Sequence, residues 1–167
     1  MMGSRADNET VTYVHIQLVW QTHHAAISLP YHRYFLSVFE KILRTEGGYD
    51  QPIPFWDWTL DADQPLNSPI WDEFAGFGPA VAGCADNKLA NYSEHGYEPH
   101  CVRRTFDSNT VDGIMHSARW NKEIVADIVE TAETYDMFRV RIESGPHKHF
   151  HLGIGGEMPT ASSTNGQ

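Results

Sequence analysis

The chain has 167 residues, of which 41% are hydrophobic, and it carries a formal net charge of −10 at pH 7. This length and apolar content suit one domain with a buried core, so we predict a single domain over residues 1–167. The acidic balance repels phosphate backbones and no run of Lys and Arg offsets it, so we expect no nucleic-acid partner.

The first helix is predicted over residues 11–20, where Val11, Val14 and Leu18 recur at helical intervals with His15 beside them. This stretch is shorter than the ~20 apolar residues of a membrane span, so we expect no membrane partner. The first residues lack a basic segment followed by an apolar core, which predicts no secretory signal in this chain. A cytoplasmic and a secreted location both stay open.

A second helix is predicted over residues 31–46. Ser28 is placed to cap it, Pro30 suits its first turn, and Gly47 with the next glycine ends it. His32 then falls on the apolar stripe of this helix, near its start.

The middle of the chain lacks helical periodicity. Residues 52–59 are aromatic and punctuated by proline, which predicts an extended run against the core. Residues 61–115 are rich in Gly, Pro, Asn and Asp, and we predict a long irregular region there. Cys84 and Cys101 lie in that region, where a disulfide and a reduced pair fit equally well.

Two further helices are predicted over residues 121–132 and 135–142, from apolar residues at helical spacing. The segment 144–146, Ser-Gly-Pro, indicates another helix start, and the glycines of 153–156 break that helix.

Histidines at spacings typical of metal ligands are the main functional signal of the sequence. They are His15, His23, His32, His147 and His151. Imidazole is the commonest neutral nitrogen ligand for zinc, copper and iron, so this set favours a nitrogen-rich metal site. A zinc protease would need a glutamate directly after the first histidine of the later pair, where Lys148 stands. Each histidine taken alone also fits a plain core role, and His24 competes with His23.

The residues around these histidines resemble the tyrosinase and catechol oxidase family. The runs 29–35 (LPYHRYF) and 52–58 (PIPFWDW) are similar to its copper A signature. Residues 138–158, with Gly-Pro-His at 145–147 and Gly-Gly-Glu-Met at 155–158, are similar to the first half of its copper B motif. Together the two motifs cover most of residues 11–160.

The resemblance implies a mainly α fold, an antiparallel helix bundle around a dinuclear type 3 copper centre with long irregular loops. It divides the chain into a copper A region (11–60), an irregular loop region (61–115) and a partial copper B region (116–160). Copper A would be held by His15, His23 and His32, and copper B in part by His147 and His151.

The third copper B histidine of the family is not found before Gln167. We therefore expect the bundle and this motif to be incomplete at the C-terminus of the given residues, with only the copper A ion held securely. His149, His100, His116 or a partner chain stay open as sources of a sixth ligand.

The implied activity is that of a copper-dependent oxidoreductase, which oxidises ortho-diphenols or related phenolics to quinones with dioxygen. Glu143 resembles the family glutamate that orients a water near copper B, although it also suits a helix cap or a pair with Arg139 or Arg141. Lys148 stands where hydroxylating members often have asparagine, which favours diphenol or aminophenol oxidation over monophenol hydroxylation. The alternatives are an inactive or truncated fragment that binds copper at the A site only, and a structural zinc site.

Overall fold

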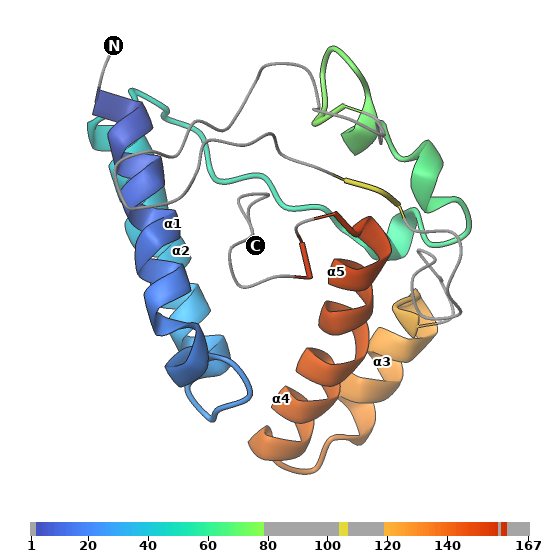
Figure 1. Cartoon of the computed structure of the whole chain (residues 1–167). Helices are drawn as coiled ribbons and strands as arrows, with labels where there is room; N and C mark the ends of the chain where they lie inside the picture. Colours follow the sequence, from blue (N-terminus) through green and yellow to red (C-terminus); the bar gives the residue numbers. More distant parts are fainter. Residues whose placement is uncertain (1–2, 79–103, 107–118, 157, 160–167) are drawn as a thin grey trace. The chain divides into compact units, whose positions relative to one another are not determined.

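The computed structural model describes residues 3–78, 104–106, 119–156 and 158–159, with side chains from residue 11 onward (Figure 1). The chain is mainly helical, which confirms the predicted fold class. It forms two compact units, residues 1–55 and 56–167, and each is described by itself. No helix of the described ranges is both long and apolar enough to cross a bilayer. The single domain and its three regions stay a prediction, and both cysteines lie outside the described residues.

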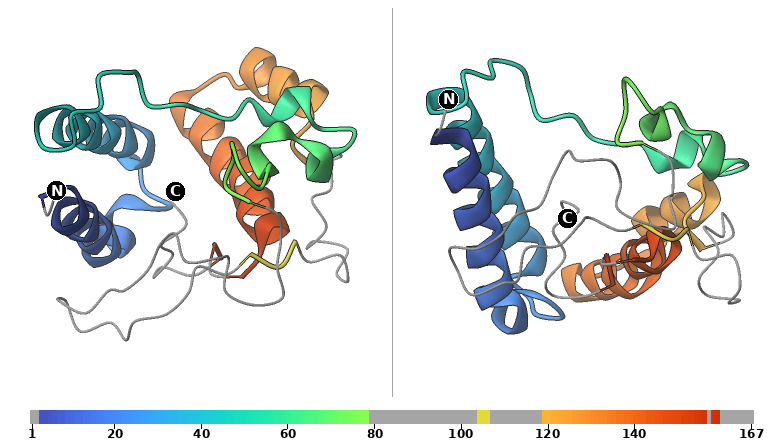
Figure 2. Two further views of the ribbon diagram at one scale, coloured as in Figure 1. Left: turned by 90° about the horizontal axis from the view of Figure 1, so that it is seen from above. Right: turned by 45° about the horizontal axis from the view of Figure 1, so that its top comes forward.

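The first unit is a hairpin of two long helices, α1 (Gly3–Thr22) and α2 (Ser28–Thr45). They run antiparallel and lie side by side in both views of Figure 2. The predicted helix at 11–20 is therefore real but longer at its N-terminal end. The chain leaves α1 through His24, whose φ of 55° lies in the left-handed region that reverses direction sharply.

The N-terminal end of α2 differs from the predicted capping pattern, whereas its C-terminal end agrees with it. Ser28 does not cap the helix but is its buried first residue, and Ile27 occupies the cap position without a side-chain hydrogen bond. This part of the prediction was wrong. The C-terminal end is as predicted: Gly48 has a φ of 66°, and a Cβ on Gly47 would lie 2.7 Å from the Leu43 carbonyl oxygen.

The second unit begins with three short 3₁₀ helices, η1 (Trp58–Leu60), η2 (Pro65–Asn67) and η3 (Pro69–Trp71). Residues 52–57 form no helix or strand, as predicted, but most of them are exposed and Phe55 is 87% exposed, so the predicted packing of this run against the core was wrong for most of its residues. Asp57 then accepts a hydrogen bond from the Thr59 N–H at 3.2 Å and starts η1. The region predicted as irregular is thus ordered into turns up to Trp71, where prolines at the helix starts fix φ.

Two helices follow at the predicted places, α3 (Lys122–Thr131) and α4 (Tyr135–Ile142). Each has a side-chain cap. The Asn121 side chain accepts from the N–H three residues later at 2.9 Å, and Thr134 does the same at 3.2 Å. These caps satisfy N–H groups that have no partner inside the helix.

The last helical segment follows α4 after a kink. The residues of η5 (Glu143–His147) join α4 to α5 (Lys148–Ile154), and the non-helical Gly145 divides them between two helices, so a new helix starts at residues 144–146 as predicted. The backbone kinks at Gly145 (φ −96°, ψ −109°), because Pro146 has no N–H and its ring would clash with a preceding carbonyl. Gly155, with a φ of 64°, ends α5 as predicted.

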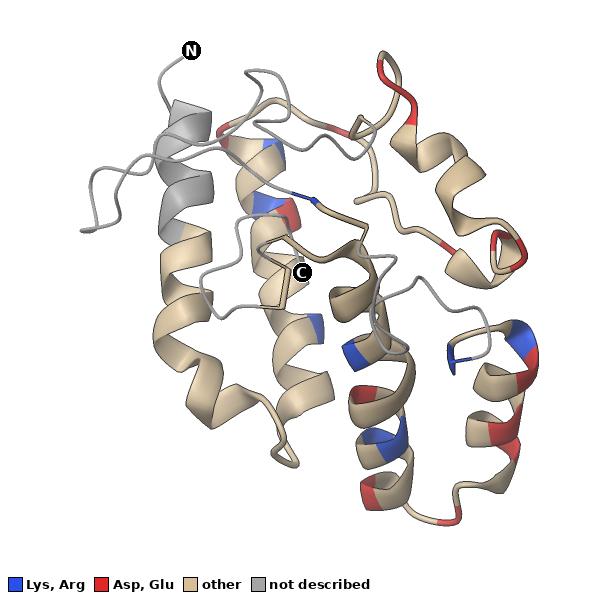
Figure 3. Ribbon diagram, turned by 45° about the vertical axis from the view of Figure 1, so that its right-hand side comes forward, with Lys and Arg blue, Asp and Glu red and all other residues tan. Residues whose placement is uncertain are grey.

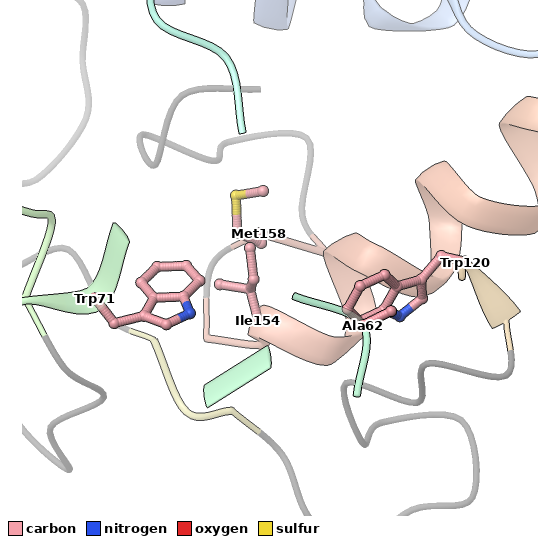
Figure 4. Packing of buried hydrophobic residues seen from close by; sticks show 5 residues of the cluster. All are labelled: Ala62, Trp71, Trp120, Ile154 and Met158. Atoms are coloured by element: carbon pink, nitrogen blue, oxygen red, sulfur yellow. The ribbon is translucent and has the colours of Figure 1, made fainter. Parts of the chain in front are cut away.

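The core of the second unit is aromatic and packs against α5 (Figure 4). Its buried members are Ala62, Trp71, Trp120, Ile154 and Met158. Figure 4 shows Ile154 and Met158 between the two indole rings. Phe150 of α5 adds ring contacts to Trp56 at 5.1 Å and to Trp58 at 5.3 Å between centroids. One face of α5 is thereby fixed to the 3₁₀ segment.

Candidate metal centre

Three histidines of the first unit converge on one point. His15 comes from α1, His23 from the residue after its end, and His32 from the first turns of α2. One nitrogen from each ring lies within 4.8 Å of the others, and the Nε2 atoms of His15 and His32 are 3.3 Å apart. The hairpin therefore assembles the predicted copper A histidines even though they span eighteen positions of the sequence.

Backbone carbonyls orient two of these rings. The Nδ1–H of His32 donates to the Ser28 carbonyl at 2.8 Å, and that of His23 donates to the Val19 carbonyl at 3.1 Å. A carbonyl only accepts, so each Nδ1 carries the proton and each Nε2 keeps its lone pair. Such an outer hydrogen bond fixes the tautomer and the ring plane of a metal-ligating histidine.

The donor set fits a metal ion. Two nitrogens at about 2.0–2.1 Å from one metal, at a trigonal or tetrahedral angle, are roughly 3.3–3.6 Å apart. The observed 3.3 Å separation matches this value. Within the ranges that the structure describes, no other group of three histidine, cysteine or acidic side chains meets the same criterion. Neutral imidazoles without a carboxylate suit copper or zinc better than magnesium or calcium.

Aromatic rings cover part of the three histidines. His15 is only 5% exposed, and its ring contacts Phe35 at 5.6 Å between centroids. Tyr31 stacks on Phe35, and burial raises the pKa of the Tyr31 hydroxyl. His23 and His32 are half-buried, and the Thr22 hydroxyl lies 3.3 Å from His23 Nδ1.

The later histidine pair belongs to the second unit. The rings of His147 and His151 lie 4.4 Å apart between centroids, on the same side of η5 and α5. The His151 Nδ1–H donates to the Met158 carbonyl at 2.9 Å, which again leaves Nε2 for a metal. His149 donates to the Gly145 carbonyl at 2.8 Å, and no described side chain joins the pair as a third ligand. His100 and His116 lie outside the described residues.

Glu143 stands at the start of the same π-helical turn and is 4% exposed. Its Oε2 lies 3.7 Å from Arg139 Nη1, whereas Arg141 pairs with Asp127 of α3. Of the two arginines considered from the sequence, the structure thus selects Arg139. The catalytic role of Glu143, and the copper roles of the five histidines, stay predictions.

Sequence reasoning missed the groups that orient the ligands. The carbonyls of Val19 and Ser28 each stand four residues before the histidine that they hold, a spacing that neighbours on a helix always have. This four-residue spacing could have identified both carbonyls from the sequence. The Met158 carbonyl had none, because it reaches His151 only after Gly155 and Gly156 turn the chain back.

Comparison with known proteins points to one family. The family model described as the common central domain of tyrosinase matches residues 6–166. The tyrosinase-like protein phomQ2 of Diaporthe leptostromiformis is 33% identical over 160 residues, which cover 86% of this chain and 40% of that protein. Tyrosinase ustQ of Aspergillus flavus is 31% identical over 158 residues, covering 86% of this chain and 44% of the relative.

A third relative shares a shorter segment. The N-acetyl-6-hydroxytryptophan oxidase ivoB of Emericella nidulans is 35% identical over 68 residues, which cover 41% of this chain and 18% of that protein. No solved structure matches the chain. The chain spans less than half the length of the three relatives named here.

Proposed function

Because the chain belongs to the tyrosinase family, we propose that it acts as a copper-dependent oxidase of small phenolic compounds, with dioxygen as the other substrate. The observation that carries the proposal is the convergence of buried His15 with half-buried His23 and His32 in a group of histidines alone. Family membership supports copper rather than zinc as its metal.

The second metal position would be supplied in part by His147 and His151. Their ring centroids lie 4.4 Å apart, and His151 has the same kind of Nδ1-to-carbonyl hydrogen bond as His23 and His32. The given residues hold five of the six histidines that the family centre implies. Copper, when bound, supplies the electron transfer to dioxygen that amino-acid side chains cannot provide.

The protein's own residues would orient the substrate and manage its protons. Oxidation of an ortho-diphenol to an ortho-quinone removes two electrons and two protons, and two diphenols reduce one dioxygen to two waters. Glu143 is the proposed acceptor of a phenolic proton, because a buried carboxylate close to the histidine pair in sequence is suited to general base catalysis. Phe35 and Tyr31 would exclude bulk water from the first copper.

The preferred substrate is proposed to be a ring that already carries two oxygen or nitrogen substituents. Lys148 follows His147 and is exposed, and its ammonium group cannot accept a proton from a phenol. The name of the relative N-acetyl-6-hydroxytryptophan oxidase supports a hydroxylated aromatic ring as the class of substrate, but that ring has a single hydroxyl, so the preference rests on Lys148. We therefore propose diphenol or aminophenol oxidation without prior hydroxylation.

A second candidate is a copper-binding chain without oxidase activity. It is favoured by the difference between the two groups, since among the described residues the first has three convergent histidines and the second has two. Three imidazoles hold a metal far more tightly than two.

The test is copper loading followed by oxygen uptake with catechol and with phenol, which differ by one hydroxyl. The proposed oxidase binds two coppers per chain and consumes one dioxygen for every two catechols, with little uptake on phenol. One bound copper and no oxygen uptake supports the second candidate. A chain that binds no copper contradicts both.

A further inference from the structure

Three charged side chains form a ladder along α4 and into η5. Arg139 donates through Nε to Asp136 Oδ1 at 3.0 Å and through Nη2 to the same oxygen. Its other terminal nitrogen, Nη1, lies 3.7 Å from Glu143 Oε2. Figure 3 shows acidic and basic residues following one another along this helix. One guanidinium therefore bridges two carboxylates.

The ladder leads from the surface into the interior. The side chain of Asp136 is 71% exposed, that of Arg139 is 11% exposed, and that of Glu143 is 5% exposed. A carboxylate that has lost its water needs a compensating partner, and a planar guanidinium with fixed N–H directions is a suitable one. Because Asp136 occupies two of its nitrogens, Nη1 is the nitrogen of Arg139 that lies near Glu143, at an ion-pair distance of 3.7 Å without a hydrogen bond.

The backbone after Glu143 makes this contact important. The chain kinks at Gly145, which lies outside helical φ and ψ and stands between Glu143 and His147. Arg139 stands one turn before Glu143 in the regular helix, where residues four apart are neighbours. Glu143 keeps helical φ and ψ (−69°, −44°) as the last position of that helix, so the regular helix holds a side chain that stands just before the kink.

We infer that Arg139 is a positioning residue: clamped by Asp136, it fixes the direction of the Glu143 carboxylate toward the reacting phenol. The role of Glu143 rests on the proposed function, whereas the contacts among the three side chains do not. The contact with Arg139 would then both stabilise the charge of Glu143 and orient Glu143 to accept a proton.

The contact is tested first in the metal-free chain by thermal unfolding. Arg139→Met keeps the length of the side chain and removes its charge, and we expect Tm to fall on the order of 10 °C, because a buried carboxylate loses its partner. Adding Glu143→Gln to Arg139→Met should restore at least about half of that loss, since no charge is then stranded. Arg139→Lys should restore part of it. Strictly additive shifts overturn the inference.

Arg141→Met is the matched control. Arg141 lies on the same helix, is 33% exposed at its side chain, and pairs with Asp127 instead of Glu143. Its loss should shift Tm by only about 2 °C and should show no coupling to Glu143→Gln.

The positioning role is tested next by steady-state oxidation of catechol at equal copper content. Arg139→Met should lower kcat on the order of tenfold with KM changed by less than about threefold, and Arg139→Lys should lie between it and the unmodified chain. Arg141→Met should retain the unmodified rate. An unchanged kcat in Arg139→Met, together with a loss in Glu143→Gln, overturns the positioning role.

The two hypotheses fail in different ways. If the unmodified, copper-loaded chain does not oxidise catechol, the proposed function fails. The inference is then decided by the coupling and by the lysine rescue in the metal-free chain, where neither depends on copper.

Discussion

His23 and His24 are adjacent in the chain and differ in environment. His23 is half-buried, belongs to the convergent group and has its Nδ1–H on the Val19 carbonyl. His24 is exposed and sits in the left-handed conformation by which the chain leaves α1. The sequence left both as candidate ligands, because a spacing that crosses a helix end obeys no rule. The geometry favours His23.

This difference predicts unequal effects on copper binding. We expect His23→Ala to weaken copper binding at the first site by at least about 100-fold, since even loss of an outer hydrogen bond to a ligand costs up to that factor. His24→Ala is the neighbouring control and should leave copper affinity unchanged. Competition with a copper chelator measures both constants, and equal weakening by the two changes would contradict the assignment.

At the scale of elements, capping explains why the short helices of the second unit begin where they do. α3 and α4 have only ten and eight residues, so unsatisfied end groups are a large share of each helix. Asn121 and Thr134 satisfy one N–H each through their side chains. These two helices carry Asp127, Arg139 and the start of the segment that presents the later histidine pair.

Removing a cap should therefore destabilise the second unit. We expect Asn121→Ala to lower the free energy of unfolding by about 1 kcal/mol, while Asn121→Asp, which keeps an acceptor oxygen, should change it by less than about half of that. Chemical denaturation followed by far-UV circular dichroism measures both values. Equal losses for Ala and Asp would show that the side-chain oxygen does not act as the cap.

At the scale of the whole molecule, the second unit depends on an aromatic core that fixes α5. Trp120 is fully buried, and its Nε1 has no hydrogen-bond partner among the described residues, so its contribution comes from packing. Phe74 of the same unit is 87% exposed. The two residues are both large and aromatic but differ in how much surface they bury.

We expect Trp120→Ala to cost about 3–5 kcal/mol of unfolding free energy, because it leaves a cavity in a close-packed cluster. Phe74→Ala should change stability by no more than about 0.5 kcal/mol. Unfolding of both variants in guanidinium, followed by intrinsic fluorescence, measures the two free energies. They are compared when the dependence of the unfolding free energy on denaturant concentration is the same in both variants. A large loss in Phe74→Ala would show that this side chain is covered in solution.

The sequence by itself determined the helices that have regularly spaced apolar residues and clear start or stop residues at their ends. α3 and α4 were predicted to within a residue or two, and α2 ends at the predicted glycines, because apolar spacing, Gly and Pro act locally. The family also followed from sequence, since unrelated residue types recur around the histidines at fixed offsets. The local signal failed at Ser28, which lies inside α2 while Ile27 occupies the cap position.

Only the tertiary structure decided which side chains meet. The hairpin of α1 and α2 brings His15 to within 3.3 Å of His32, and the turn at Gly155 brings the Met158 carbonyl to His151. Each contact depends on how two segments fold back on one another, a property set by summed packing over many residues rather than by any motif.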